Sequence, residues 1–160
     1  MKSTINYYTI ISSTLFIVLL SSCNKSIEGC MDSRANNRCG ECNVSNNESC
    51  EYTGEAVIWY QYTVGDSLEA RGHSSLRFYI DGNLLGTTPV YHHYWPLDPI
   101  FGTPPRAFCG DADAFTFQRT WLKNDTQEFN YSVRDTNDVE LFSGAINFKV
   151  NQCPHSELKF

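Results

Sequence analysis

The chain has no surplus of positive charge. Its 160 residues include 12 Lys and Arg against 18 Asp and Glu, for a formal net charge of −6. This balance disfavours a nucleic-acid partner and a polybasic membrane-binding surface, because both need clustered Lys and Arg. Charged residues amount to only 19%, whereas aromatic residues reach 14%. A disordered chain is poor in aromatic residues and rich in charge, so we expect one folded domain with a small appendage.

The common catalytic signatures are also missing, namely GxSxG, HExxH, the P-loop and GxGxxG. His73 and His155 lie among polar loop residues, which is more typical of solvated than of catalytic histidines. No cysteine is left over as a nucleophile if six of the seven form disulfides. We therefore predict that the protein is not an enzyme and that it carries neither a cofactor nor a metal.

One long hydrophobic run is present, and it lies near the N-terminus. Residues 10–20 (IISSTLFIVLL) follow the positive charge of Lys2 and are too few to cross a bilayer comfortably as a helix. The string LSSC at residues 20–23 resembles the lipobox of bacterial lipoproteins. That resemblance implies cleavage before Cys23, a diacylglycerol on its sulfur and an acylated amine, and two or more acyl chains hold a protein stably on a membrane. The alternative is an ordinary secretory signal.

The residues around the cleavage point predict a location. Without Cys23 the mature chain has six cysteines, an even number suited to complete pairing in an oxidising compartment. Asn24 stands where an aspartate would resemble an inner-membrane retention signal. We therefore expect residues 1–22 to be a lipoprotein signal peptide and residues 23–28 a tether. The protein is then lipid-anchored in the outer membrane, on its periplasmic or its surface-facing side.

A short cysteine-rich segment follows at residues 29–52. It opens with Gly-Cys-x-Asp and closes with Ser-Cys-x-Tyr, and in this it resembles a repeat of secreted and lipid-anchored Bacteroidetes proteins. The matching positions are Cys30, Asp32, Ala35, Asn37, Ser49, Cys50 and Tyr52. The segment departs from the repeat where Cys39 and Cys42 are inserted and where Glu48 replaces a glycine.

The composition of residues 29–52 predicts disulfides independently of that resemblance. A segment this short, rich in Asn and Ser and without apolar periodicity, cannot bury a core of its own. Four cysteines allow three connectivities. We favour Cys30–Cys50 as the outer bridge and Cys39–Cys42 as a tight local one. A zinc site and a thioredoxin-type CxxC are alternatives, but an oxidising compartment disfavours the first and the lack of a strand-helix pattern disfavours the second.

From residue 53 onward the pattern is typical of β-strands, and helical periodicity is nowhere sustained. Asp81-Gly82 between two apolar runs predicts a hairpin. We therefore predict an all-β domain over residues 53–160, an antiparallel β-sandwich of about seven strands, preceded by the small disulfide-stapled module. The predicted strands are residues 55–63, 76–80, 84–86, 115–122, 128–134, 140–143, 145–150 and 157–160.

Several short stretches of this domain point to a family. They are AVIW at 56–59, FYIDG at 78–82, CG at 109–110, FSGAI at 142–146 and NQC at 151–153. With them the region resembles small Bacteroidetes lipoproteins of unassigned activity that carry an immunoglobulin- or transthyretin-like β-domain. In that family the central and C-terminal cysteines look paired, which implies a Cys109–Cys153 bridge here.

Residues 87–114 form a long segment without a strand pattern, and it holds five of the six prolines. Loops of this length are usually functional or disordered, and the aromatic content argues against disorder. The rings of Tyr91, Tyr94, Trp95 and Phe101 are candidate contacts for a glycan or a peptide. The alternative, slightly favoured, is that these rings fold back and cap one sheet.

The same segment suggests a metal-assisted hydrolase as a remote third function. Its residues would be His92 or His93 with Asp111 and Asp113. Adjacent histidines on an extended chain point to opposite sides and chelate poorly, so no metal site is predicted. The leading prediction is a non-enzymatic, lipid-anchored envelope protein with a scaffolding, adhesion or partner-contact role. A module that recognises a glycan or peptide through the loop at 87–114 is the alternative.

Overall fold

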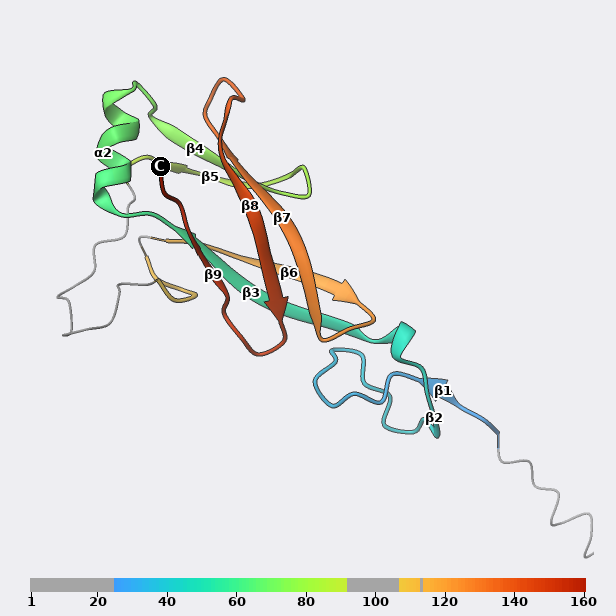
Figure 1. The fold of residues 1–160 in the computed structure, drawn as a ribbon. Helices are drawn as coiled ribbons and strands as arrows, with labels where there is room; N and C mark the ends of the chain where they lie inside the picture. The colour runs from blue at the N-terminus through green and yellow to red at the C-terminus, as the bar shows by residue number, and fades with distance from the viewer. Residues whose placement is uncertain (1–24, 92–106, 113) are drawn as a thin grey trace, which may run out of the picture.

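The fold is known from a computed structural model that describes residues 25–91, 107–112 and 114–160 (Figure 1). The predicted signal peptide and Cys23 lie outside these residues. The described part is mostly β-strand with one α-helix. In chain order the elements are β1 (Glu28–Gly29), β2 (Val44–Ser45), the 3-10 helix η1 (Asn47–Ser49), β3 (Glu51–Trp59), α2 (Tyr62–Ala70), β4 (Ser75–Ile80), β5 (Asn83–Pro89), β6 (Phe115–Leu122), β7 (Thr126–Arg134), β8 (Glu140–Lys149) and β9 (His155–Glu157).

The strands are divided among three sheets, so the predicted single sandwich of seven antiparallel strands is not confirmed in that form. The largest sheet is antiparallel with the order β5-β4-β7-β8, the second has the order β6-β3-β9, and β1 pairs with β2. The pairs β3–β9 and β1–β2 are parallel. The coarser prediction of a β protein stapled by disulfides is confirmed.

The hairpin between β4 and β5 follows from its two turn residues. Asp81 and Gly82 both adopt positive φ angles, 47° and 78°. This is the backbone that a tight two-residue turn requires if its twist is to match that of the flanking strands. Alternate residues of β4 are buried, namely Leu76, Phe78 and Ile80. The predicted Asp-Gly hairpin is therefore confirmed, and its apolar face points into the protein.

One apolar cluster lies between the four-stranded and the three-stranded sheet. Phe148 of β8 is at its centre, with ring contacts to Phe117, Trp121 and Phe129 at centroid distances of 5.6, 5.9 and 5.1 Å. Gly54 of β3 makes room for the indole of Trp121, because a Cβ there would lie 2.9 Å from the ring. The two sheets are thus packed face to face through interlocking aromatic rings.

A helix, α2, stands where the sequence predicted a strand as far as Thr63 and no helix at all. The strand β3 ends at Trp59, and α2 begins at Tyr62. The helix has nine residues and buries Val64 and Leu68, which are one turn apart. Two apolar residues four apart are too short a periodic signal to separate a helix from a strand.

Residues 140–149 form one strand, β8, rather than the predicted pair of strands divided at Gly144. The glycine is accommodated within the strand because the ring of Tyr131, its cross-strand partner on β7, occupies the space above it. A Cβ on Gly144 would lie 2.7 Å from the Tyr131 hydroxyl oxygen. Other boundaries were also wrong: β3 begins at Glu51 and β7 at Thr126, β5 extends to Pro89, and the last strand is His155–Glu157 rather than 157–160.

Candidate functional site

The cysteine module, residues 29–52, contains the disulfides Cys30–Cys50 and Cys39–Cys42, which is the favoured one of the three connectivities. The sulfurs of Cys30 and Cys50 are buried, whereas Cys39 and Cys42 are partly exposed. Cysteines bonded in this way cannot hold zinc as thiolates. A Cys39–Cys42 disulfide is also the oxidised form of a CxxC dithiol, but no helix begins at these cysteines as it does in a thioredoxin-type motif. Cys50 is followed directly by β3, so the outer bridge fastens the module to the first strand of the large domain.

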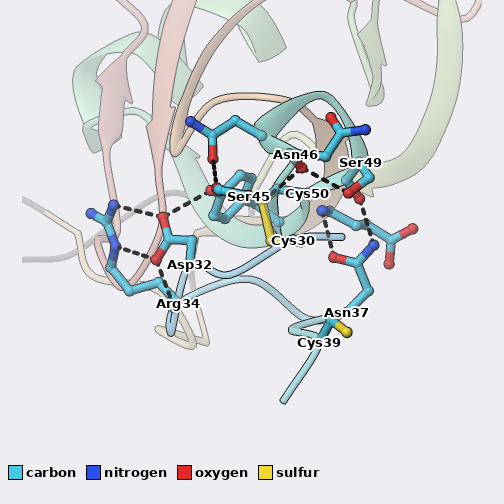
Figure 2. The surroundings of a disulfide bond; sticks show 12 residues. Cys30, Asp32, Arg34, Asn37, Cys39, Ser45, Asn46, Ser49 and Cys50 are labelled. Atoms are coloured by element: carbon cyan, nitrogen blue, oxygen red, sulfur yellow. Dashed lines mark hydrogen bonds and ion pairs between the residues drawn. A yellow bond between two sulfur atoms is a disulfide. The ribbon is translucent and has the colours of Figure 1, made fainter. Parts of the chain in front are cut away.

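Asp32 organises the polar side of this module, and Figure 2 shows its carboxylate facing Arg34 beside the Cys30–Cys50 bridge. The carboxylate accepts hydrogen bonds from the Arg34 backbone N–H at 2.9 Å and from Arg34 Nη2 at 2.8 Å. The Tyr52 hydroxyl donates a further bond at 2.8 Å. Hydrogen bonds from Arg34, above all, hold the pKa of Asp32 far below its ordinary value. Burial, followed by the bond to Asp32, raises the pKa of Tyr52.

Two asparagine side chains supply further hydrogen bonds within the module. The Asn37 side chain donates to the Ser49 carbonyl at 2.6 Å and accepts from the Glu51 N–H at 2.8 Å. The Asn46 side chain accepts from the Glu48 N–H at 3.0 Å and so caps η1. Asp32, Asn37 and Tyr52 are three of the positions that match the Bacteroidetes repeat. In this chain they replace an apolar core with hydrogen bonds around a disulfide.

The module is also bound to the turn between β6 and β7. Arg34 Nη1 lies 2.6 Å from an oxygen of Asp125, while Nη2 of the same guanidinium binds Asp32. The Lys123 N–H donates to the Cys50 carbonyl at 2.8 Å, and its ammonium lies 2.6 Å from Glu48. The hydrogen bond to Glu48 raises the pKa of Lys123. In Figure 1 the module lies at one end of the molecule and α2 at the other.

Replacing Asp32 with asparagine is expected to change how stability depends on pH. The folded pKa of Asp32 is lowered from an ordinary value of 3.8, so its contribution is fully present above that value. The contribution is lost as the pH falls through the lower folded pKa. We expect the difference in unfolding free energy between wild type and Asp32→Asn to be largest above about pH 5 and to shrink steadily below about pH 4.

Urea titrations of both proteins at several pH values measure this difference. Ser33→Asn, an exchange at the exposed and uncharged neighbour, is the control and should retain the wild-type dependence. A difference between wild type and Asp32→Asn that stays constant from pH 7 to pH 2 contradicts the assignment.

The Cys109–Cys153 bridge, implied by the family resemblance, is present and lies on the outer side of the three-stranded sheet. It is part of a second, smaller apolar cluster in which Val57, Trp59 and Ala107 are buried. Alternate residues of β3 therefore face two different cores. The bridge holds residues 107–112 against the strand, and the Asp111 side chain accepts a bond from the Phe108 N–H at 2.6 Å.

Most of the predicted contact and metal residues fall outside the described part of the chain. The residues outside it are Tyr94, Trp95, Phe101, His92, His93 and Asp113. Tyr91 is described and exposes 63% of its surface. Asp111 serves as the hydrogen-bond acceptor of its own turn. Over the described residues no group of three or more His, Cys, Asp and Glu side chains is placed to hold a metal ion.

Sequence reasoning missed a shallow groove of about 450 Å³ on the outer face of the four-stranded sheet. Small side chains form its floor, since Ser132 and Ser143 are cross-strand partners on β7 and β8. At one side the Arg134 guanidinium lies over the Tyr79 ring, 5.0 Å from its centroid. Asp138 accepts from the Tyr79 hydroxyl at 3.2 Å and from Arg134 at 3.3 Å. Arg134 and Asp138 therefore pair with each other. Asp81 and Glu140 also line the groove, so it combines hydroxyl and amide groups with acidic side chains.

His73 is not simply solvated as its sequence context suggested. Its Nδ1 lies 3.4 Å from a carboxylate oxygen of Asp135, which is only 5% exposed. Asp135 also accepts the N–H bonds of Asn137 and Val139 at 2.9 and 2.8 Å, and so shapes the turn between β7 and β8. The backbone bond from Val139 is the main cause that lowers the pKa of Asp135.

Comparisons with known proteins found no matching family model, no matching curated protein and no matching solved structure. Within the described ranges, none of the helical segments has the length and apolar character needed to span a bilayer. The functional argument therefore depends on the residues and contacts of this chain.

Proposed function

We propose that this chain is a non-enzymatic, lipid-anchored protein of the cell envelope, which holds a β-domain in position for contact with a partner. The observation that carries the proposal is the junction between module and domain. The chain passes from Cys50 into β3 without a linker, and Arg34 joins Asp32 of the module to Asp125 of the domain. Such a junction makes module and domain one stiff body next to the tether at residues 23–28. A stiff spacer of this kind suits scaffolding or adhesion better than it suits catalysis.

The lipid anchor is tested with the exchange Cys23→Ala. Loss of the sulfur removes the acceptor for diacylglycerol, so the variant should leave the detergent phase in a phase-partition experiment, whereas the wild type should remain in it. Intact mass should show the acyl chains on the wild type alone. Ser22→Ala is the matched control, because it keeps a small residue before the cysteine and should still partition into detergent. Equal partition of Cys23→Ala and wild type refutes the proposal.

Recognition of a glycan or peptide by the segment at residues 87–114 is the second candidate. The observation in its favour is the exposure of two rings at the described ends of that segment. Tyr91 exposes 63% and Phe108 55% of its surface. Cys109, bonded to Cys153, fixes one of these ends to the three-stranded sheet. Exposed aromatic rings on a rigid base are common anchors for sugar faces and for peptides.

A further inference from the structure

The outer edge of β8 has backbone groups that no other strand uses. β7 and β8 are antiparallel with Tyr131 opposite Gly144, and the Val150 N–H donates to the Asp125 carbonyl at 3.0 Å in the same register. Hydrogen-bonded pairs alternate along an antiparallel ladder, so even-numbered residues of β8 bond to β7. The N–H and C=O groups of Ser143, Ala145 and Asn147 therefore point away from the sheet. No strand among the described residues pairs with this side of β8.

The other three edges of the two larger sheets each carry a feature that opposes strand addition. β5 contains Pro89 and pairs with β4 through an irregularity at Phe78/Tyr79, and β9 has only three residues. On β6, Arg119 lies on the same face of the strand as the buried Phe117 and Trp121. Its guanidinium lies 5.7 Å from the centroid of the Phe129 ring. Prolines, bulges, short edge strands and inward-pointing charges are the usual devices against edge-to-edge pairing.

β8 has none of these devices along its central part. Its ten residues, ELFSGAINFK, include no proline, and the only charges are those of the first and last residue. The register with β7 is continuous from Phe142 to Lys149. Ser143, Gly144 and Ala145 are exposed and small, so a neighbouring backbone can approach without displacing a side chain. The strand is a regular, open template for one more strand.

The charges at the two ends of β8 indicate which strand fits. Glu140 is at the start and Lys149 at the end, and neither forms an ion pair with another described residue. If a second β8 pairs antiparallel about a two-fold axis near Ala145, each Glu140 comes to the end where the other copy's Lys149 lies. Parallel pairing would instead bring like charges together. The antiparallel self-pair is thus complementary in both hydrogen bonding and charge.

We propose that the β8 edge is an interface for a second copy of this chain, in which two antiparallel β8 strands join two four-stranded sheets into one. Lys149 pairs with Thr126, next to the module-bound Asp125, so β8 runs toward the cysteine module. The two-fold axis therefore places the two modules at opposite ends of the dimer. Such a dimer is suited to joining two membrane surfaces. This consequence rests on the proposed lipid anchor, but the proposal of the dimer does not depend on that anchor.

Sedimentation of the full chain in density-matched detergent, over a wide range of protein concentration, measures the dimer. Wild type should show a concentration-dependent monomer–dimer equilibrium, and amide exchange at Ser143, Ala145 and Asn147 should slow as dimer forms. Ala145→Pro removes an outward N–H without removing a bond to β7, and should raise the dissociation constant at least about tenfold. Ala145→Ser keeps that N–H and is the matched control. A wild type that remains monomeric up to about 1 mM, where an interface of this kind should be populated, overturns the proposal.

Charge exchange distinguishes a second copy from any other strand. Glu140→Lys and Lys149→Glu should each raise the dissociation constant at least about threefold, because each places like charges at both ends of the pair. The double exchange restores both ion pairs and should return the constant to within about twofold of wild type. This test does not depend on the folding of the proline variant. Failure of the double exchange to restore dimerisation, or tighter association of either single variant, overturns the antiparallel self-pair. Either result leaves the lipid anchor to be judged separately by the partition of Cys23→Ala.

Discussion

Replacing Phe148 with alanine is expected to lower the free energy of unfolding by about 3–5 kcal/mol. The Phe148 ring is fully buried and lies between the two large sheets. It contacts the rings of Phe117, Trp121 and Phe129 edge-on. Truncation removes the transfer free energy of the ring and leaves a cavity that rigid aromatic neighbours cannot fill. Such a loss is a large part of the total stability of a domain of this size.

Leu122→Ala on β6 is the control for this exchange, because Leu122 follows the core residue Trp121 on the facing sheet but is 55% exposed. We expect it to change the unfolding free energy by no more than about 0.5 kcal/mol. Urea denaturation followed by circular dichroism measures both variants. If Phe148→Ala costs no more than Leu122→Ala, the ring does not hold the sheets together as described.

The β-strands were predictable because their signals are local. Alternation of Leu76, Phe78 and Ile80 and the Asp81-Gly82 turn identify a hairpin from adjacent residues alone. The continuity of β8 was not predictable in this way. Gly144 weakens a strand by its own propensity, and it is accommodated by Tyr131, thirteen residues away on the neighbouring strand. A choice that depends on a cross-strand partner needs the pairing to be known first.

The division of β3 between two cores was also hidden in the sequence. Residues 56–59 form a continuous apolar run, which predicts a strand buried on both faces but not what covers each face. Ala56 and Ile58 belong to the large cluster, whereas Val57 and Trp59 belong to the small one. One face meets the aromatic cluster, while the other is covered by residues near Cys109. Only the family resemblance pointed to the Cys109–Cys153 bridge. The strand pattern says nothing about the loop that the bridge brings back to the sheet.

The contacts that join module and domain depend on distant residues as well. Arg34 and Asp125 are 91 positions apart, so no spacing rule connects them. The important residues within the module were easier to identify from the sequence, because Asp32, Asn37 and Tyr52 match positions of the repeat that the segment resembles. Their roles as hydrogen-bond centres still required the geometry. The same is true of the β8 edge, since β8 is an edge strand only by virtue of the sheet order.

Removing the Cys109–Cys153 bridge by a double exchange to serine is expected to lower the free energy of unfolding by about 4 kcal/mol. The two cysteines are 44 positions apart, and closing a loop of that length restricts the unfolded chain by roughly this amount in the chain-entropy model. The loss should also have a local part. Without the bridge, residues 107–112 are no longer fastened over Val57 and Trp59, which are buried beneath them.

The double exchange of Cys39 and Cys42 to serine is the matched control, because its loop spans a separation of only three. We expect that control to lose about 1–2 kcal/mol, so denaturation should separate the two variants clearly. Hydrogen exchange at Val57 and Trp59 should accelerate only in the variant that lacks the long bridge. Equal losses in the two variants would contradict the loop-length argument. Unchanged exchange at those two residues would mean that the outer face of β3 is covered without the disulfide. The bridge would then restrict the unfolded chain alone, and the segment beside Tyr91 would lose its fixed base for binding a ligand.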